Sequence, residues 1–329
     1  MPIIRVSKRA GGLRSRSMRG KTARSMLSYR LSSGARSYLK SILNPSYSGA
    51  KIPDSFGSKT CTIQLQREKR IEVAPSGSAQ AGKIGGLMQL SIAPIAWDIG
   101  SVNSTAWGYD ALIDGAPAYH NITGGAAGSK LPTLFRSARV VSAGIKVQFV
   151  GNTQNDQGTI TVFAIDRPHM SSQTTVSGGI IGNPDLFGAA SSLSSLSAAN
   201  GDVLRSLPVN AFGPVRQGCT VRYYPVDDRD LEFHPYVPQE TVSPANYAGC
   251  WNGTVGALGF LCEGLSTASG NPGSVVVQYT VNLECVVRDD SFNLVSSDSS
   301  PVDPKGLAAA ATVYLLFLLR TVMFCVLFL

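Results

Sequence analysis

The amino-acid sequence predicts an all-β protein, an antiparallel eight-stranded sandwich of the jelly-roll type, with a different kind of segment at each end. Three observations support this class. The 329 residues include 34 glycines and 18 prolines, which is typical of many short strands joined by turns. Apolar and polar residues alternate over several segments, without the regular strand–helix alternation of α/β folds. Only 15% of the residues are charged and 43% are hydrophobic, so the chain can bury a core.

Residues 1–53 are a basic arm that we expect to be disordered or helical. They hold twelve lysines and arginines and no acid, whereas the other 276 residues carry 17 bases and 21 acids. Such a block repels itself, but it can neutralise phosphates in salt-dependent binding that ignores sequence. A mitochondrial transit peptide and a generic basic tail are the alternatives. The candidate RNA-binding residues are Arg5, Lys8, Arg9, Arg14, Arg16, Arg19, Lys21, Arg24, Arg30, Arg36 and Lys40.

Apolar residues recur at helical spacing near the end of the arm, and Pro45 limits the helix that they predict. Arg36 and Lys40 lie off the apolar stripe. A basic amphipathic helix of this kind can lie on RNA, on a membrane surface or under a protein shell, and the sequence does not choose among the three. The stripe consists of Leu31, Ala35, Tyr38, Leu39 and Ile42.

Residues 54–290 are predicted to form the sandwich. Its clearest strand is 275–287, in which every second residue from Val275 is apolar and the opposite face carries Gln278, Thr280, Asn282 and Glu284. A second clear pair of strands is 141–149 and 159–165, joined by a polar turn. The apolar face of its first strand is Val141, Ala143, Ile145, Val147 and Phe149. Weaker strands are predicted at 60–66, 70–73, 87–93, 218–224 and 254–262, and a loop or short helix at 189–199.

After a linker at 291–306, residues 307–329 are almost entirely apolar. As a helix they would extend roughly 34 Å, enough to cross a hydrocarbon core of roughly 30 Å. Arg320 within the segment costs insertion energy that the apolar residues can outweigh. A membrane anchor and a membrane-disrupting peptide both fit this pattern.

No catalytic residue can be named. The six cysteines have no metal-binding or redox spacing, and three histidines are too few for a multi-histidine centre. Residues 124–130 resemble a phosphate loop, and residues 264–268 a nucleophile elbow, but each departs from the required pattern. We therefore expect neither an enzyme nor a small-molecule substrate.

Four acidic residues within 227–232 are the candidate metal site. In an extended segment, Asp230 and Glu232 would point to the same side, and two carboxylates beside loop carbonyls suit calcium. A solvated acidic loop, or a salt bridge to Arg222 or Arg229, is the alternative.

Several short motifs resemble capsid proteins of nodaviruses, small icosahedral positive-strand RNA viruses. At the end of the arm they are Tyr38-Leu39-Lys40, Pro45-Ser46-Tyr47 and Lys51-Ile52-Pro53-Asp54-Ser55-Phe56. In the body they are Gly158-Thr159-Ile160-Thr161-Val162-Phe163, Asp230-Leu231-Glu232-Phe233 and Leu283-Glu284-Cys285.

The resemblance implies a structural protein of the virion, present in the host cytoplasm during assembly. Such a subunit self-assembles into a shell, packages viral RNA on its arm and disrupts a host membrane on entry. It also holds calcium at subunit interfaces, and Asp230 and Glu232 match the family's ligands. Members of the family cleave themselves with an aspartate near the arm junction. Here Ser46 takes that place and residues 283–329 contain no Asn-Ala pair, so we predict no such cleavage.

A different class of protein also fits this layout. A tail-anchored membrane protein, with a cytosolic β-sandwich binding domain and its arm on anionic lipid, is the alternative function.

Overall fold

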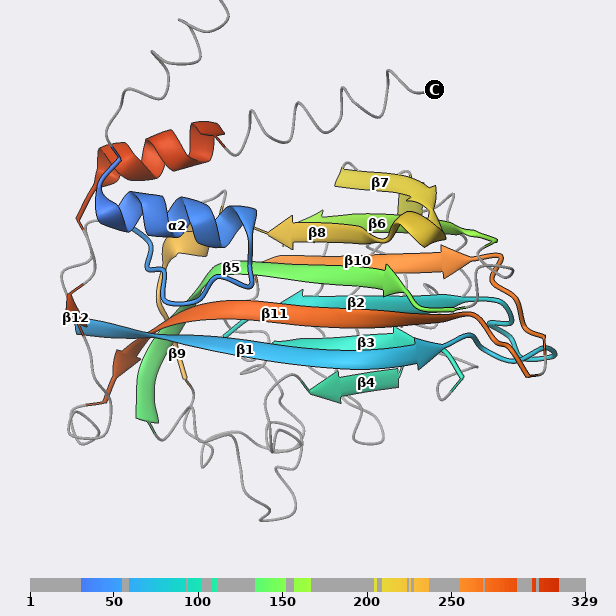
Figure 1. Cartoon of the computed structure of the whole chain (residues 1–329). Helices are drawn as coiled ribbons and strands as arrows, with labels where there is room; N and C mark the ends of the chain where they lie inside the picture. The colour runs from blue at the N-terminus through green and yellow to red at the C-terminus, as the bar shows by residue number, and fades with distance from the viewer. Residues whose placement is uncertain are drawn as a thin grey trace, which may run out of the picture.

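The computed structural model confirms the all-β class, because two antiparallel sheets form the body of the protein (Figure 1). It describes residues 31–54, 59–92, 94–101, 108–111, 134–151, 157–166, 204–205, 209–223, 225, 228–236, 255–268, 270–288, 298–299 and 302–313. In this part of the chain the first sheet has the order β12-β1-β11-β5-β8, with β9 beside β5. The second sheet has the order β4-β3-β2-β10-β6-β7.

Every segment predicted as a strand overlaps an observed strand, although the bounds differ and the two strands predicted at 60–66 and 70–73 are one continuous strand, β1. The first sheet consists of β1 (Lys59–Glu72), β5 (Phe135–Phe149), β8 (Cys219–Tyr223), β9 (His234–Pro235), β11 (Ser274–Val287) and β12 (Asp298–Ser299). The second consists of β2 (Ile84–Leu90), β3 (Ile95–Ile99), β4 (Gly108–Ala111), β6 (Thr159–Asp166), β7 (Val209–Pro214) and β10 (Gly256–Glu263). Two short 3-10 helices, η3 (Val215–Gln217) and η4 (Asp228–Leu231), flank β8.

The core lies between the sheets and contains the alternate side chains that the sequence predicts. On β11 every second residue from Val275 to Val287 is at most 2% exposed. The sheets approach each other closely at Gly86 of β2. A Cβ atom added there would lie 2.3 Å from both the Phe260 ring and the Tyr279 hydroxyl. Glycine is therefore required at this position by packing rather than by a turn.

The two strands predicted as a pair, 141–149 and 159–165, both exist but do not pair with each other. β5 lies between β11 and β8 in the first sheet, whereas β6 lies between β10 and β7 in the second. The connection crosses between the sheets and ends at Gly158, whose φ of 114° favours glycine. Alternation did not reveal this crossing, because both strands bury one face against the same core.

An irregularity in β5 changes the side on which Val141 lies. The register between β5 and β11 shifts between Asn282 and Leu283, which leaves Val141 as an extra residue on β5. Val141 therefore packs with Tyr38 and Ile42 outside the sandwich. Its predicted place on the core face is wrong, since a strict two-residue period does not allow for an inserted residue.

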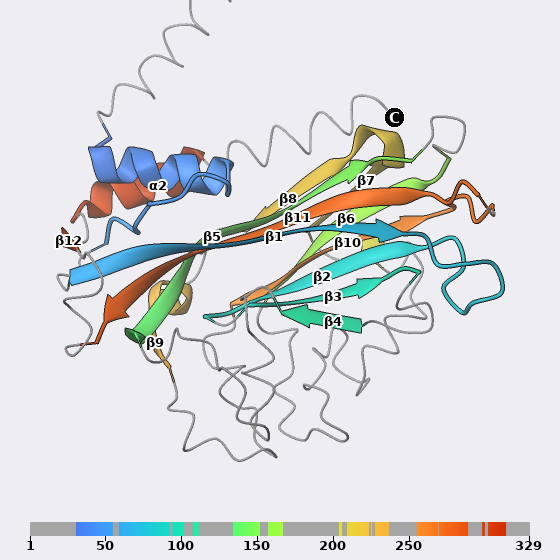
Figure 2. The same ribbon diagram turned by 60° about the horizontal axis from the view of Figure 1, so that its bottom comes forward.

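A helical layer, made of α2 (Ser33–Leu43) and the helix at 304–313, covers part of the outer face of the first sheet (Figures 1 and 2). The helix predicted at the end of the arm is confirmed. The Ser32 hydroxyl accepts a hydrogen bond from the Ala35 N–H at 3.1 Å and so caps its N-terminus. Tyr38, Ile42 and Ala310 form a small apolar cluster between this layer and the sheet.

The C-terminal helix begins at residue 304, slightly before the predicted Leu307. Asp303 caps it, because its carboxylate accepts from the Gly306 N–H at 2.8 Å. Proline fits the first position of a helix, so Pro304 starts this helix within the segment predicted as a linker. No helix among the described residues has the length and apolar character needed to cross a membrane.

Several predictions lie outside the described residues. They are the arm before residue 31, the segment 189–199, most of the predicted linker at 291–306 and residues 314–329 of the apolar segment.

Candidate functional site

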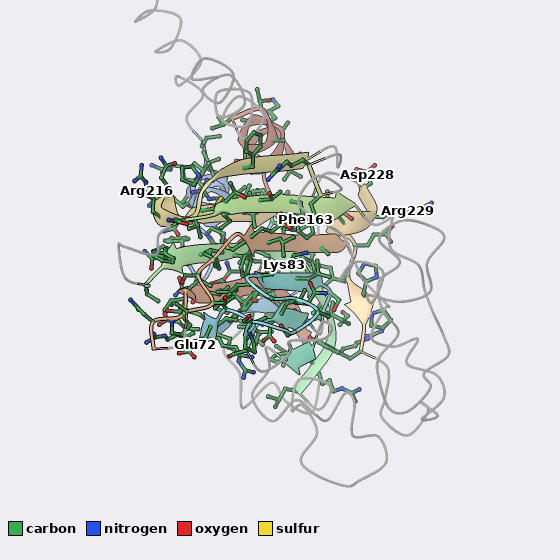
Figure 3. The ribbon with its side chains drawn as sticks, turned by 90° about the vertical axis from the view of Figure 1, so that its right-hand side faces the viewer. Glu72, Lys83, Phe163, Arg216, Asp228 and Arg229 are labelled. Carbon is green, nitrogen blue, oxygen red and sulfur yellow. The ribbon has the colours of Figure 1, made fainter. Side chains whose placement is uncertain are left out.

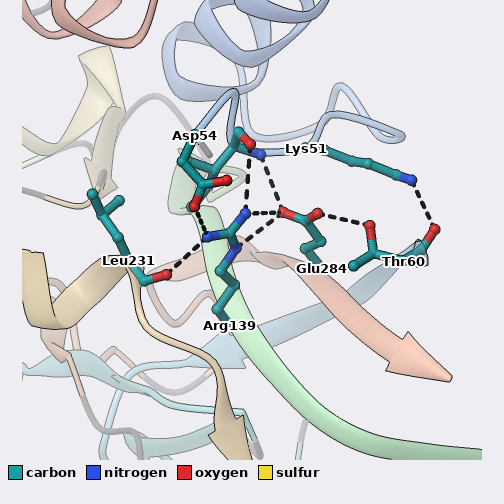
Figure 4. Close-up of polar contacts among 7 residues, drawn as sticks. Lys51, Asp54, Thr60, Arg139, Leu231 and Glu284 are labelled. Carbon is teal, nitrogen blue, oxygen red and sulfur yellow. Dashed lines mark hydrogen bonds and ion pairs between the residues drawn. The ribbon is translucent and has the colours of Figure 1, made fainter. Parts of the chain in front are cut away.

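The candidate functional site is the junction between the arm and the sandwich, under the helical layer. At its centre is a junction cluster of Asp54, Thr60, Arg139 and Glu284 (Figure 4). Arg139 donates to one Glu284 carboxylate oxygen from Nε at 3.0 Å and from Nη2 at 2.8 Å. It also forms an ion pair with Asp54. The Thr60 hydroxyl donates to the second Glu284 oxygen at 2.7 Å.

The junction cluster also holds the backbone of neighbouring segments. The Ile52 N–H donates to Glu284 at 3.2 Å, and Arg139 Nη1 donates to the Leu231 carbonyl at 2.8 Å. Arg139 is 1% and Glu284 0% exposed. Both charges are therefore compensated and closed to solvent, which suits a structural role rather than substrate chemistry.

A second polar group lies nearby on the same face of the sheet. The Asn282 amide donates to the Pro45 carbonyl at 2.7 Å and to the Ser142 hydroxyl at 2.9 Å. Gln64 donates to the Pro45 carbonyl at 3.1 Å. Together with the junction cluster, these bonds hold the backbone that follows α2 in one position across β1, β5 and β11. The polar face predicted for β11 is thus present, with Thr280, Asn282 and Glu284 buried and Gln278 half-buried.

Two of the candidate RNA-binding residues are described, and both lie on the solvent side of α2. Arg36 and Lys40 are exposed and four residues apart, so they share one face of the helix. Lys305 is exposed on the neighbouring helix. The Lys40 ammonium lies 5.6 Å from the centroid of the Tyr47 ring. The other candidates, Arg5, Lys8, Arg9, Arg14, Arg16, Arg19, Lys21, Arg24 and Arg30, lie outside the described residues.

The candidate calcium ligands differ from the predicted geometry. The segment is not extended, because residues 228–231 form the 3-10 helix η4. Asp230 is consequently buried, whereas Glu232 is exposed, and the premise that they point to one side is wrong. Asp228 and Arg229 lie at the margin of the ribbon in Figure 3. No group of three or more potential metal-binding side chains occurs in the described part of the chain. Calcium binding stays a prediction.

Ser46, which takes the place of the aspartate used for self-cleavage in nodavirus capsid proteins, lies at the start of the junction. Ser46 is exposed, and its backbone N–H donates to the Asn44 side chain at 3.3 Å. The absence of self-cleavage stays a prediction.

The junction cluster was not predicted from the sequence. Glu284 was assigned to a polar strand face and to the motif Leu283-Glu284-Cys285, and Arg139 was not singled out. A signal was nevertheless present, because each is a charged residue within a strand of mostly apolar residues. Charged residues are fully buried almost only when they are paired. What the sequence did not show was that these two lie opposite each other, which is a property of the β5–β11 register.

No family model and no curated protein sequence matches the chain. Among solved structures, the D431N mutant VP2 protein of infectious bursal disease virus, from derived T=1 particles, aligns with 86% of this chain and 91% of its own. Its identity is 12% and the TM-score 0.49. The decameric BFDV capsid protein aligns with 70% of this chain and 99% of its own, at 11% identity and a TM-score of 0.32. Similarity of this size does not establish a family or a function.

Proposed function

We propose that the chain is a viral capsid subunit, similar to those of nodaviruses, that self-assembles into an icosahedral shell around RNA. One observation carries the proposal. The helices next to the two ends of the chain, α2 and 304–313, lie together on one outer face of the sandwich (Figures 1 and 2). The basic arm and the apolar segment are therefore attached on the same side. A shell subunit needs such a difference between its faces, because one face contacts the genome and other surfaces contact neighbouring subunits.

The order of the strands supports a jelly-roll body. Apart from β12, β9, β3 and β4, the first sheet has the order β1-β11-β5-β8 and the second the order β2-β10-β6-β7. The first and last of these eight strands are neighbours, and the strands pass repeatedly between the sheets. This is the arrangement that two Greek keys produce.

RNA packaging is proposed from charge and position. The arm holds twelve bases without an acid; two of them, the exposed Arg36 and Lys40, lie on the helical layer together with the exposed Lys305. We expect this face to line the inside of the shell. Binding through phosphates releases condensed counterions, so it does not depend on the RNA sequence but weakens as salt rises.

The apolar C-terminal segment is proposed to disrupt a host membrane on entry. The sequence from Leu307 onward provides the length and hydrophobicity, and the helix at 304–313 attaches it beside the arm. Both segments would then be enclosed until the shell opens. The virion, and the host cytoplasm during assembly, follow as the locations of the protein.

Expression of the full chain in the presence of RNA tests the proposal. We expect closed particles in negative-stain electron microscopy and RNA that is protected from nuclease. Replacement of Arg14, Arg16, Arg19, Lys21 and Arg24 by glutamine should lower the ratio of absorbance at 260 and 280 nm without unfolding the body. Protein that stays monomeric with RNA would refute the capsid function.

A matched pair of variants locates the RNA-binding face. Arg36→Gln with Lys40→Gln removes two exposed charges from the helical layer and should lower the RNA content. Arg216→Gln with Arg229→Gln removes two exposed charges from η3 and η4, outside that layer, and should not. Equal losses in both pairs would contradict the assignment.

Deletion of residues 314–329, which keeps the helix at 304–313 and its buried Ala310, separates this function from that of a tail-anchored protein. A capsid subunit should still form shells and lose only its lysis of lipid vesicles. A tail-anchored protein should form no shells and should move from the membrane fraction into solution.

A further inference from the structure

A pair of thiols lies in the core beside the junction cluster. Cys61 on β1 and Cys285 on β11 are directly opposite each other in the antiparallel register. Opposite residues of such strands have Cα atoms about 4.5–5.5 Å apart, which is within the range that a disulfide requires. Both residues are thiols in this structure, and the Cys285 thiol donates a hydrogen bond to the Cys61 sulfur.

The two cysteines differ in their surroundings. Cys61 lies on β1, whose other side is paired only at residues 59 and 60 in the described part of the chain, and it is 8% exposed. Cys285 is fully buried. A small oxidant that approaches the edge of the sheet therefore meets Cys61 first. The sulfur of Cys285 then lies within reach as the second partner.

The hydrogen bond also divides the chemical roles. It lowers the pKa of Cys61, against the effect of burial, and the Lys51 ammonium lowers that pKa further. The same bond and burial raise the pKa of Cys285 well above its ordinary value. Thiolates are the reactive form of cysteine, so Cys61 is the nucleophile and Cys285 the resolving thiol.

We propose that Cys61 and Cys285 are a redox pair, which a hydroperoxide converts into a disulfide that joins β1 to β11. The Cys61 sulfur attacks the O–O bond of hydrogen peroxide, becomes a sulfenic acid and releases one water. The Cys285 sulfur then displaces hydroxide from the sulfenic sulfur, and the Cys285 proton converts this hydroxide into a second water. Two thiols lose two electrons in total, and one peroxide is reduced to two waters.

The consequence of the disulfide follows from its position. It would tie an edge strand to the centre of the first sheet, next to the residues that hold the arm. Thr60 and Glu284, the neighbours of the two cysteines, already hydrogen-bond to each other. A cross-link between residues so far apart in the chain restricts the unfolded state strongly. Oxidation would therefore stabilise the subunit at its arm junction.

Disulfide mapping of the full-length protein tests the inference. The protein is treated with hydrogen peroxide, its remaining thiols are alkylated under denaturing conditions, and unreduced peptides are analysed by mass spectrometry. We expect a peptide that links Cys61 to Cys285, the loss of two thiols per chain, and full reversal by dithiothreitol. The linked peptide should be absent from Cys61→Ser.

Cys219→Ser is the matched control. Cys219 lies on β8 and its neighbour Cys262 on β10, in opposite sheets, so this change should leave the Cys61–Cys285 peptide intact. The inference is overturned if oxidised wild-type protein yields Cys61 only as sulfinic acid, or linked to a different cysteine. The wild-type map decides the question even if a variant does not fold. None of these measurements requires assembled shells, so their failure is distinct from failure of the proposed capsid function.

Discussion

Arg139 and Glu284 lie between the helical layer and the first sheet, each with at most 1% of its surface exposed. Removing two such charges from water is costly, and their attraction offsets the cost only when every hydrogen-bonding group is satisfied. Here Glu284 accepts from Thr60 and Ile52 as well as from Arg139. The pair therefore holds three parts of the chain in register, and loss of one partner would leave an uncompensated buried charge.

Arg139→Met tests this role. We expect a loss of about 3–5 kcal/mol in the free energy of unfolding, measured by urea denaturation of the unassembled subunit. Arg70→Met is the control, because the side chains of Arg70 and its ion-pair partner Glu72 are 61% and 47% exposed, and Arg70 otherwise donates to the Ser274 hydroxyl at 3.2 Å. Exposed pairs contribute below about 1 kcal/mol. Similar losses in the two variants would contradict the role of the junction cluster.

We expect the docking of the C-terminal helix to depend on pH through Asp303. The Ser32 hydroxyl and the Gly306 N–H donate to its carboxylate and lower its pKa below the ordinary value of 3.8. A lowered pKa means that the stabilisation is present above the ordinary value and is lost as the pH falls through the lowered one. Asp303→Ala should therefore lower the urea midpoint at pH 7, and this difference should shrink below pH 3.8.

The matching control for Asp303 is Asp303→Asn. Asparagine still caps a helix but does not titrate in this range, so the midpoint should stay high and lose its acid dependence. A constant difference between wild type and Asp303→Ala at all pH values would show that the carboxylate charge does not contribute.

At the scale of elements, the two helices of the helical layer pack through small residues. A Cβ atom added to Gly306 would lie 2.5 Å from the Ala35 Cβ, so the helices approach closely at this point. Ala310 is fully buried beside Tyr38 and Ile42. Each helix therefore covers an apolar surface that the other would leave exposed, and the two should dock together.

Ala310→Glu tests this docking. A buried carboxylate without a partner costs several kcal/mol, so the helix at 304–313 should leave the sheet. Tryptic cleavage after Lys305 should then become faster by about tenfold or more, because each 1.4 kcal/mol corresponds to a factor of ten. Ala308→Glu on the exposed side of the same helix should leave the cleavage rate nearly unchanged. An equal increase in both variants would mean that the helix is not docked.

At the scale of the whole molecule, we propose that Asp230 and Glu232 lie near a neighbouring subunit, as the resemblance to nodavirus capsid proteins implies. The two residues come from η4 and the segment after it, and the described part of this chain contains no complete metal site. A calcium ion there would need oxygen ligands from a second copy. This dependence connects metal binding to the stability of the assembly rather than to that of the single chain.

Chelation of purified particles tests the calcium proposal. EGTA should loosen wild-type shells, seen as slower sedimentation and nuclease-sensitive RNA. Particles of Asp230→Asn with Glu232→Gln should not respond to EGTA, whereas Asp228→Asn, at an exposed neighbour, should respond like wild type. Double-mutant shells that still loosen with EGTA would eliminate these two residues as ligands.

Much of the fold could be predicted because its signals are local. The alternation on β11 and the apolar stripe on α2 each lie within about a dozen residues, and both are confirmed. The junction cluster could not be predicted, since Arg139 and Glu284 are 145 residues apart in the chain. For the candidate calcium ligands the local pattern misled, because acidic residues fit an extended segment and a 3-10 turn equally well.

Composition and short-range periodicity were enough to define a basic end, an apolar end and a sandwich between them. Charge and alternation are local properties, which can be read from residues close together in the sequence. The fold in three dimensions was needed to separate β5 from β6, to turn Val141 away from the core and to bring residues 33–43 beside 304–313. These three features depend on how segments far apart in the sequence pack against one another, and local sequence patterns do not specify that packing.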